Sequence, residues 1–141
     1  MAGVSGVRVT QPIASVMTIA VTAVTVTKKE FDKFLARDRH CYHCGISDET
    51  LVPQHRRNRG MGGSKRLNNA SNIVVVCSQS NGLFESSEVA SVTAQRYGWK
   101  LRAGQESINT PVFDAYEGIW YLLDDNFGKK EIPPTEAEGT P

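Results

Sequence analysis

Two short apolar runs, separated by a long polar segment, limit how this chain can fold more than any other feature of it. The runs are LVPQH at residues 51–55 and NIVVVC at residues 72–77. Both have the length and the β-branched content of strands. The segment at residues 58–71 is rich in glycine, asparagine and basic residues, which is typical of a loop. The sequence therefore predicts a strand, a loop, a second strand and then the start of a helix.

This order of elements would bring one histidine and two asparagines together. His55 ends the first run, Asn72 opens the second, and Asn81 lies four residues past Cys77. An imidazole titrates near neutral pH and can take a proton from water, while a carboxamide oxygen can bind Mg²⁺ or Mn²⁺. The pattern favours a site with one base and two amides. The alternative is an exposed histidine beside asparagines that serve as turn and cap residues, where asparagine is common.

Positive charge gathers in the same region, although the formal net charge of the whole chain is only +1. The basic residues that follow His55 are Arg56, Arg57, Arg59, Lys65 and Arg66. A local field of this kind attracts a polyanion, and the glycines among these residues would let the backbone approach a phosphate closely. We expect these five side chains to bind the phosphates of DNA. A solvated charged face is the alternative.

The chain has three cysteines, Cys41, Cys44 and Cys77, so they cannot all pair with one another in disulfides. An odd number that includes a Cys-x-x-Cys motif indicates a reducing compartment and metal or thiol chemistry. A structural zinc takes four ligands, and His40 or His43 could supply the fourth. Two alternatives stay open: a zinc site on three cysteines, or cysteines that are only core or turn residues.

The length of 141 residues predicts one domain with tails. We expect residues 1–26 to be a leader, either disordered or containing one strand, and residues 27–132 to form the domain. The composition of residues 133–141 predicts a disordered tail. The run at residues 13–26 is too short to span a bilayer, and a clear signal peptide is absent from the sequence. A cytoplasmic protein without membrane partners is therefore expected.

Two helices are predicted, at residues 27–38 and 86–97. Thr27 and Glu30 have the spacing of a capping box at the start of the first helix. Ser86 or Ser87 would cap the second helix, and Gly98 would end it. Three later runs are β-like, at residues 99–101, 110–115 and 118–125, and residues 125–128 have the composition of a turn. The predicted fold class is α+β.

Residues 37–86 resemble the HNH endonucleases, a family of ββα-metal nucleases, and in particular the small HNH proteins of bacteriophages. The resemblance rests on QH at residues 54–55, RGMGGS at residues 59–64, Asn72 five residues before Cys77, and CSQSN at residues 77–81. It implies a ββα-metal centre with an N-terminal helix packed against it and a β-rich C-terminal extension. The implied location is the cytoplasm of a host cell.

The resemblance also implies an activity, which is metal-dependent hydrolysis of phosphodiester bonds in DNA. His55 would be the general base, and Asn72 would hold the loop that orients it. Gln54 and Asn81 would bind the catalytic Mg²⁺ or Mn²⁺. DNA is the implied partner, and phage packaging proteins are further partners by family analogy. A structural zinc would bind Cys41, Cys44 and Cys77.

Two residues depart from the family pattern. Gln54 stands where many relatives have an aspartate, so that Asp48 or Glu85 is a candidate for the missing acid. Ser80 stands where relatives with a structural zinc have their fourth cysteine. A DNA-binding module that keeps the HNH fold but cuts weakly or not at all is therefore the alternative function. A zinc-knuckle interaction protein is a third interpretation.

Overall fold

The two predicted strands pair with each other in the computed structural model, which describes residues 26–57 and 68–138. β2 (Leu51–His55) runs antiparallel to β3 (Ile73–Cys77), with Leu51 opposite Cys77 and His55 opposite Ile73. The short 3₁₀ helix η4 (Ala70–Asn72) leads into β3. All residues of β3 are buried, so this strand lies at the centre of the core.

The first predicted helix is present as α1 (Lys28–Asp38). Its capping box is formed in both directions, because Glu30 N donates to Thr27 Oγ1 at 3.1 Å and Thr27 N donates to Glu30 Oε1 at 3.0 Å. Phe34 is buried in the core. The capping prediction is confirmed.

Two helices follow β3 without a long connection. α2 (Ser78–Ser86) begins directly after the strand, and α3 (Glu88–Arg96) is capped by Ser87, whose Oγ accepts from Ala90 N at 3.2 Å. Gly98 lies just past α3 with φ +80°, and a Cβ there would meet the carbonyl oxygen of Pro111 at 2.1 Å. Only glycine fits this position, so the predicted end of the helix is confirmed.

The C-terminal part forms a three-stranded antiparallel sheet in the order β4 (Val112–Asp114), β5 (Ile119–Leu123) and β6 (Lys129–Ile132). The predicted turn at residues 125–128 joins β5 to β6. The run at residues 99–101 was predicted to be β-like but is irregular. Trp99 N donates to Ala94 O and Leu101 N donates to Arg56 O. These backbone groups are therefore not available for the hydrogen bonds of a strand pair.

The predicted disordered tail is partly wrong. Residues 134–138 form the short helix α4 (Pro134–Glu138), and Ala137 is buried with α4 in contact with β5. Proline is well tolerated in the first turn of a helix, so the composition that predicted disorder also permits this turn. The predicted leader at residues 1–26, except for its last residue, lies outside the described residues.

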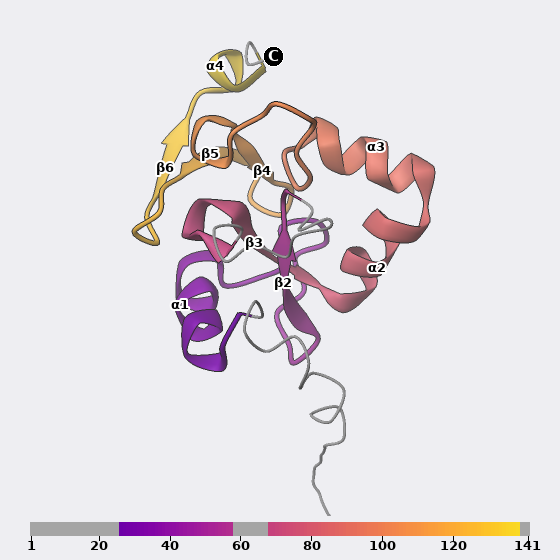
Figure 1. Cartoon of the computed structure of the whole chain (residues 1–141), viewed down its shortest axis with the longest axis vertical. Helices are drawn as coiled ribbons and strands as arrows, with labels where there is room; N and C mark the ends of the chain where they lie inside the picture. Colours follow the sequence, from indigo (N-terminus) through magenta and orange to yellow (C-terminus); the bar gives the residue numbers. More distant parts are fainter. Residues whose placement is uncertain (1–25, 58–67, 139–141) are drawn as a thin grey trace, which may run out of the picture.

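Within the described residues the fold is a small mixed α+β domain with four α-helices and two small antiparallel sheets, which confirms the predicted class. α1 packs on β3, and α2 contacts both β2 and β3 (Figure 1). The sheet of β4, β5 and β6 lies at one end of the molecule with α4 beyond it (Figure 1). None of the helices in the described part of the chain is long and apolar enough to cross a membrane.

A buried arginine at the end of β2 joins the segment before β3 to the segments around α3 and β4. The side chain of Arg56 is fully buried, and among the described residues its guanidinium donates to backbone carbonyl oxygens. The acceptors are Gly98 O at 2.7 Å, Ser71 O at 2.8 Å, Ser107 O at 3.1 Å, Thr110 O at 2.7 Å and Pro111 O at 3.4 Å. Burial, helped by the charge of Arg37, lowers the pKa of Arg56 to about 9, so the group is still charged at neutral pH.

Replacing this side chain should therefore destabilise the whole domain. We expect Arg56→Ala to lower the free energy of unfolding by about 3 kcal/mol or more, because several buried carbonyls lose their donor. The matched control is Arg102→Ala at an exposed position, which should change it by less than about 0.5 kcal/mol. Urea denaturation measures both variants. Equal stability of the two variants would contradict this role for Arg56.

Candidate functional site

His55 lies at the end of β2, where the chain leaves the sheet for the loop. Its side chain is half-buried, and Nε2 lies 2.8 Å from Asn68 Oδ1. A carboxamide oxygen can only accept, so Nε2 carries the hydrogen and Nδ1 is the proton-accepting nitrogen of the neutral ring. Asn68 was not singled out in the sequence, although it lies in an asparagine-rich stretch just before Asn72.

Asn72 holds the first residues after His55. Its side chain is 3% exposed, and its Oδ1 accepts from the backbone N–H of Arg57 at 2.8 Å. Its backbone oxygen accepts from the N–H of Arg56, also at 2.8 Å. These two bonds fix the direction in which the chain leaves β2. This is the geometry expected of a residue that supports the position of His55.

Gln54 and Asn81 lie together, but they bind each other. Gln54 is 1% exposed, and its Oε1 accepts from Asn81 Nδ2 at 2.6 Å. Gln54 Nε2 donates to the backbone oxygens of His55 and Trp99, at 3.2 and 3.1 Å. The predicted ligand oxygen of Gln54 is thus already used in a hydrogen bond. Both residues are amides without a charge, and the oxygen of Gln54 is occupied, so they do not fit a binding site for a catalytic divalent ion.

The two acids considered as substitutes are engaged elsewhere. Asp48 Oδ1 accepts from the N–H and the hydroxyl of Thr50, and these hydrogen bonds lower the pKa of Asp48. Glu85 lies 3.7 Å from the ammonium of Lys100. Within the described residues, two groups of three His, Cys, Asp or Glu side chains could hold a metal, and neither includes His55.

The five predicted phosphate-binding residues separate into three cases. The prediction for Arg56 is wrong. Its guanidinium is fully buried and binds carbonyl oxygens, so it cannot reach a phosphate. Arg57 is half-buried, and its guanidinium donates to the backbone oxygen of Gln105. The last three residues, with the glycine-rich segment, lie outside the described residues; they are Arg59, Lys65 and Arg66.

The three cysteines converge. Their sulfur atoms all lie within 4.8 Å of one another, with Cys44 Sγ 3.7 Å from Cys77 Sγ. Cys41 Sγ accepts from the N–H groups of His43 and Cys44, each at 3.4 Å, and Cys77 Sγ accepts from Ser80 N at 3.4 Å. Backbone donors of this kind stabilise thiolates, which are the form that binds a metal.

Ser80 and His43 lie beside the three sulfurs. Ser80 Oγ is 3.2 Å from Cys77 Sγ and 3.8 Å from Cys41 Sγ, and His43 Nδ1 is 2.8 Å from the same Oγ. Burial lowers the pKa of His43, which favours the neutral, ligating form of the ring. Burial opposes ionisation of Cys77, but hydrogen bonds from Ser80 and the neighbouring thiols outweigh it, so the pKa of Cys77 is lowered.

The three cysteines could hold a metal ion. Cys41, Cys44 and Cys77 would supply three thiolates, whereas the ring of His43 contacts this cluster through Ser80 Oγ. The other histidine considered, His40, belongs to a different cluster. When bound, zinc would tie the Cys-x-x-Cys turn to the start of α2.

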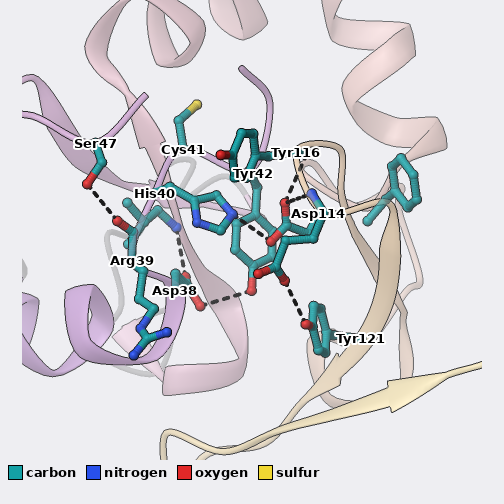
Figure 2. Close-up of polar contacts among 12 residues, drawn as sticks. Asp38, Arg39, His40, Cys41, Tyr42, Ser47, Asp114, Tyr116 and Tyr121 are labelled. Atoms are coloured by element: carbon teal, nitrogen blue, oxygen red, sulfur yellow. Dashed lines mark hydrogen bonds and ion pairs between the residues drawn. The ribbon is translucent and has the colours of Figure 1, made fainter. Parts of the chain in front are cut away.

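His40 joins a polar network that connects this turn to the C-terminal sheet (Figure 2). Its Nε2 lies 2.7 Å from Asp114 Oδ2, while Asp114 Oδ1 accepts from the N–H groups of Tyr116 and Glu117. Glu117 in turn accepts from the hydroxyl of Tyr121 at 2.9 Å. Burial raises the pKa of Asp114. These groups could hold a metal, but they already satisfy one another, which favours a structural tie.

Comparison of the chain with protein-family models, with curated proteins and with solved structures found no match. The function must therefore be inferred from the geometry of the site and from the motifs that build it.

The cysteine cluster generates a prediction about zinc. We expect the purified protein to contain about one equivalent of zinc, and a chelator to lower its melting temperature, because such binding is coupled to folding. Ser80→Cys should raise the affinity for zinc by adding a fourth thiolate beside Cys41 and Cys77. Metal analysis and competition with a chromophoric chelator measure this.

The matched control is Ser78→Cys, which adds a thiol at an exposed position near Cys77 and should leave the zinc affinity unchanged. Zinc-free protein whose stability is unaffected by a chelator would leave the cysteines as core or turn residues only.

Proposed function

We propose that this protein is an HNH-type DNA endonuclease that hydrolyses phosphodiester bonds with His55 as general base. The observation that carries the proposal is the position of His55 at the end of β2. There, its ring is oriented by Asn68, in a unit of two antiparallel strands followed directly by α2. The motifs of residues 37–86 support the same assignment, including the ββα-metal fold.

In this mechanism His55 Nδ1 removes a proton from a water molecule as its oxygen attacks phosphorus. The bond from phosphorus to the leaving sugar oxygen then breaks, and that oxygen is protonated from solvent. Asn68 keeps the ring in the tautomer that can accept the proton. Asn72 contributes by holding the backbone of the two residues after His55, and so acts as a positioning residue.

The basic residues would bind the DNA backbone on both sides of the scissile bond. Arg56 is excluded from this role by its burial. Arg57, Arg59, Lys65 and Arg66 remain candidates, with Arg57 the one whose position is described. Contacts of this kind give affinity without selecting a base sequence.

The resemblance implies a divalent ion, Mg²⁺ or Mn²⁺, which would stabilise negative charge on the phosphate. The hydrogen bond between Gln54 and Asn81 favours a second candidate function, a DNA-binding module that cuts weakly or not at all. A plasmid-nicking assay with Mg²⁺, Mn²⁺, Ni²⁺ and EDTA in parallel distinguishes the two. Cleavage in any metal supports the nuclease, and binding without cleavage in all of them supports the module.

His55 should be needed for cleavage but not for binding. We expect His55→Ala to slow cleavage by about 10²- to 10⁴-fold, while DNA affinity stays within a few-fold. His55→Gln is the matched variant, because an amide can still donate to Asn68 but cannot act as the base. Single-turnover cleavage and equilibrium binding are the measurements. Cleavage at the wild-type rate by either variant would show that the base is another group.

A carboxylate beside Gln54 should create a better ion site. We expect Asn81→Asp to tighten Mn²⁺ binding by roughly tenfold, because a carboxylate replaces the amide whose nitrogen donates to Gln54 Oε1 and leaves that oxygen without its donor. Gln79→Asp makes the same change at an exposed position of α2 and should have no such effect. Calorimetric titration with Mn²⁺ measures both. Equal affinities in the two variants would place the ion elsewhere.

A further inference from the structure

A cavity of about 340 Å³ lies next to the chain segment that follows His55. Its walls come from the end of α3, from the segment of residues 102–111, from β5 and from α4. This volume is within the range of pockets that bind small ligands. None of the residues proposed above to act in catalysis lines it.

Two arginines line the cavity and are exposed, Arg96 and Arg102. Neither forms a salt bridge with a residue that the structure describes. The guanidinium of Arg96 lies 5.8 Å from the centre of the Tyr97 ring, which is a cation–π arrangement. Guanidinium groups bind phosphate oxygens through paired hydrogen bonds, so this wall of the cavity is suited to an anion.

Two aromatic rings also line the cavity. Tyr97 and Trp120 are only half-buried, and their centres are 6.1 Å apart. Both pack on Phe113, at 5.3 and 5.0 Å between ring centres, and Tyr97 also contacts the buried Trp99 at 5.2 Å. The rings are therefore held in place by other aromatic side chains, and both remain partly exposed at the cavity. Such rings are platforms on which a flat base can stack.

The wall of the cavity is hydrogen-bonded to the two residues that follow His55. The guanidinium of Arg57 donates to the backbone oxygen of Gln105, a lining residue, and Leu101 N donates to Arg56 O at 2.7 Å. Arg56 also donates to the carbonyl oxygens of Gly98 and Thr110 in the cavity wall. The two residues after His55 thus hold the cavity wall in place.

We propose that this cavity binds one nucleotide, with its base against Tyr97 and Trp120 and its phosphate at Arg96 and Arg102. The choice of ligand rests on the proposed function as a DNA-acting protein. An unpaired nucleotide near the scissile bond presents a free base face, whereas a base inside a duplex is already stacked. The occupant is therefore a nucleotide within a single-stranded or frayed strand. A free nucleotide has the same base and phosphate, so the test below compares the two.

The test measures binding in EDTA with His55→Ala protein, so that cleavage does not interfere. The probes are dAMP, a short single-stranded oligonucleotide and a duplex of the same sequence. We expect dAMP and the single strand to quench the fluorescence of Trp120, with the single strand binding more tightly. Trp120→Phe assigns the signal, because the other tryptophan, Trp99, is buried.

The variant Arg96→Gln/Arg102→Gln should weaken binding of the single strand by about tenfold or more. It should also lower the slope of log affinity against log salt by about 0.7 for each lost contact. Arg39→Gln, an exposed arginine that does not line the cavity, is the matched control and should match the parent protein. Melting temperatures show that each variant is folded.

The outcomes separate this proposal from the proposed catalysis. Quenching by dAMP and the single strand, weakened in the double variant, supports the cavity even if no metal allows the wild-type protein to cut DNA. Quenching by dAMP alone would assign the cavity to a free nucleotide and overturn the strand as occupant. Absence of quenching by both, or unchanged affinities in the double variant, would overturn the nucleotide site even in an active nuclease.

Discussion

The buried guanidinium of Arg56 connects the segments that build the candidate site and the cavity. Burying a charged group costs free energy unless hydrogen bonds replace its water. Here the replacements are carbonyl oxygens from the segment before β3 and from the segments around α3 and β4, which include Ser71, Gly98 and Thr110. These segments must be in place together for the charge to be satisfied. The candidate catalytic residue and the cavity are therefore parts of one cooperative unit.

A second set of contacts organises the other side of the site. The cysteine cluster joins the Cys-x-x-Cys turn to the start of α2, while His40 joins the same turn to β4 through Asp114. At the start of α2, Asn81 Nδ2 donates to Oε1 of Gln54, the residue before His55. This pairing uses the Gln54 oxygen that was predicted to bind an ion. It is the physical reason why DNA binding without efficient cleavage competes with the nuclease assignment.

Features that depend on neighbouring residues could be predicted from the sequence. The capping box of Thr27 and Glu30, the cap at Ser87, the stop at Gly98 and the turn at residues 125–128 all follow from local hydrogen bonding or backbone sterics. The two central strands were predictable as well, because their apolar runs are short and bounded by polar residues. The order of these elements also predicted that His55, Asn72 and Asn81 converge; in the structure Asn72 binds the backbone of the two residues after His55, and Asn81 binds Gln54.

The order and type of most elements could be predicted from the sequence, which left open whether the three cysteines form one metal site or are only core or turn residues. The tertiary structure decided which polar groups are free to act. It buried Arg56 while leaving Arg96 and Arg102 exposed, and it set His43 rather than His40 beside the sulfurs. Such outcomes depend on contacts between residues far apart in the chain, often more than 40 positions, as between Arg56 and Thr110. An arginine has the same local sequence signal whether its partners are water, phosphate or buried carbonyl oxygens, so only the folded chain distinguishes them.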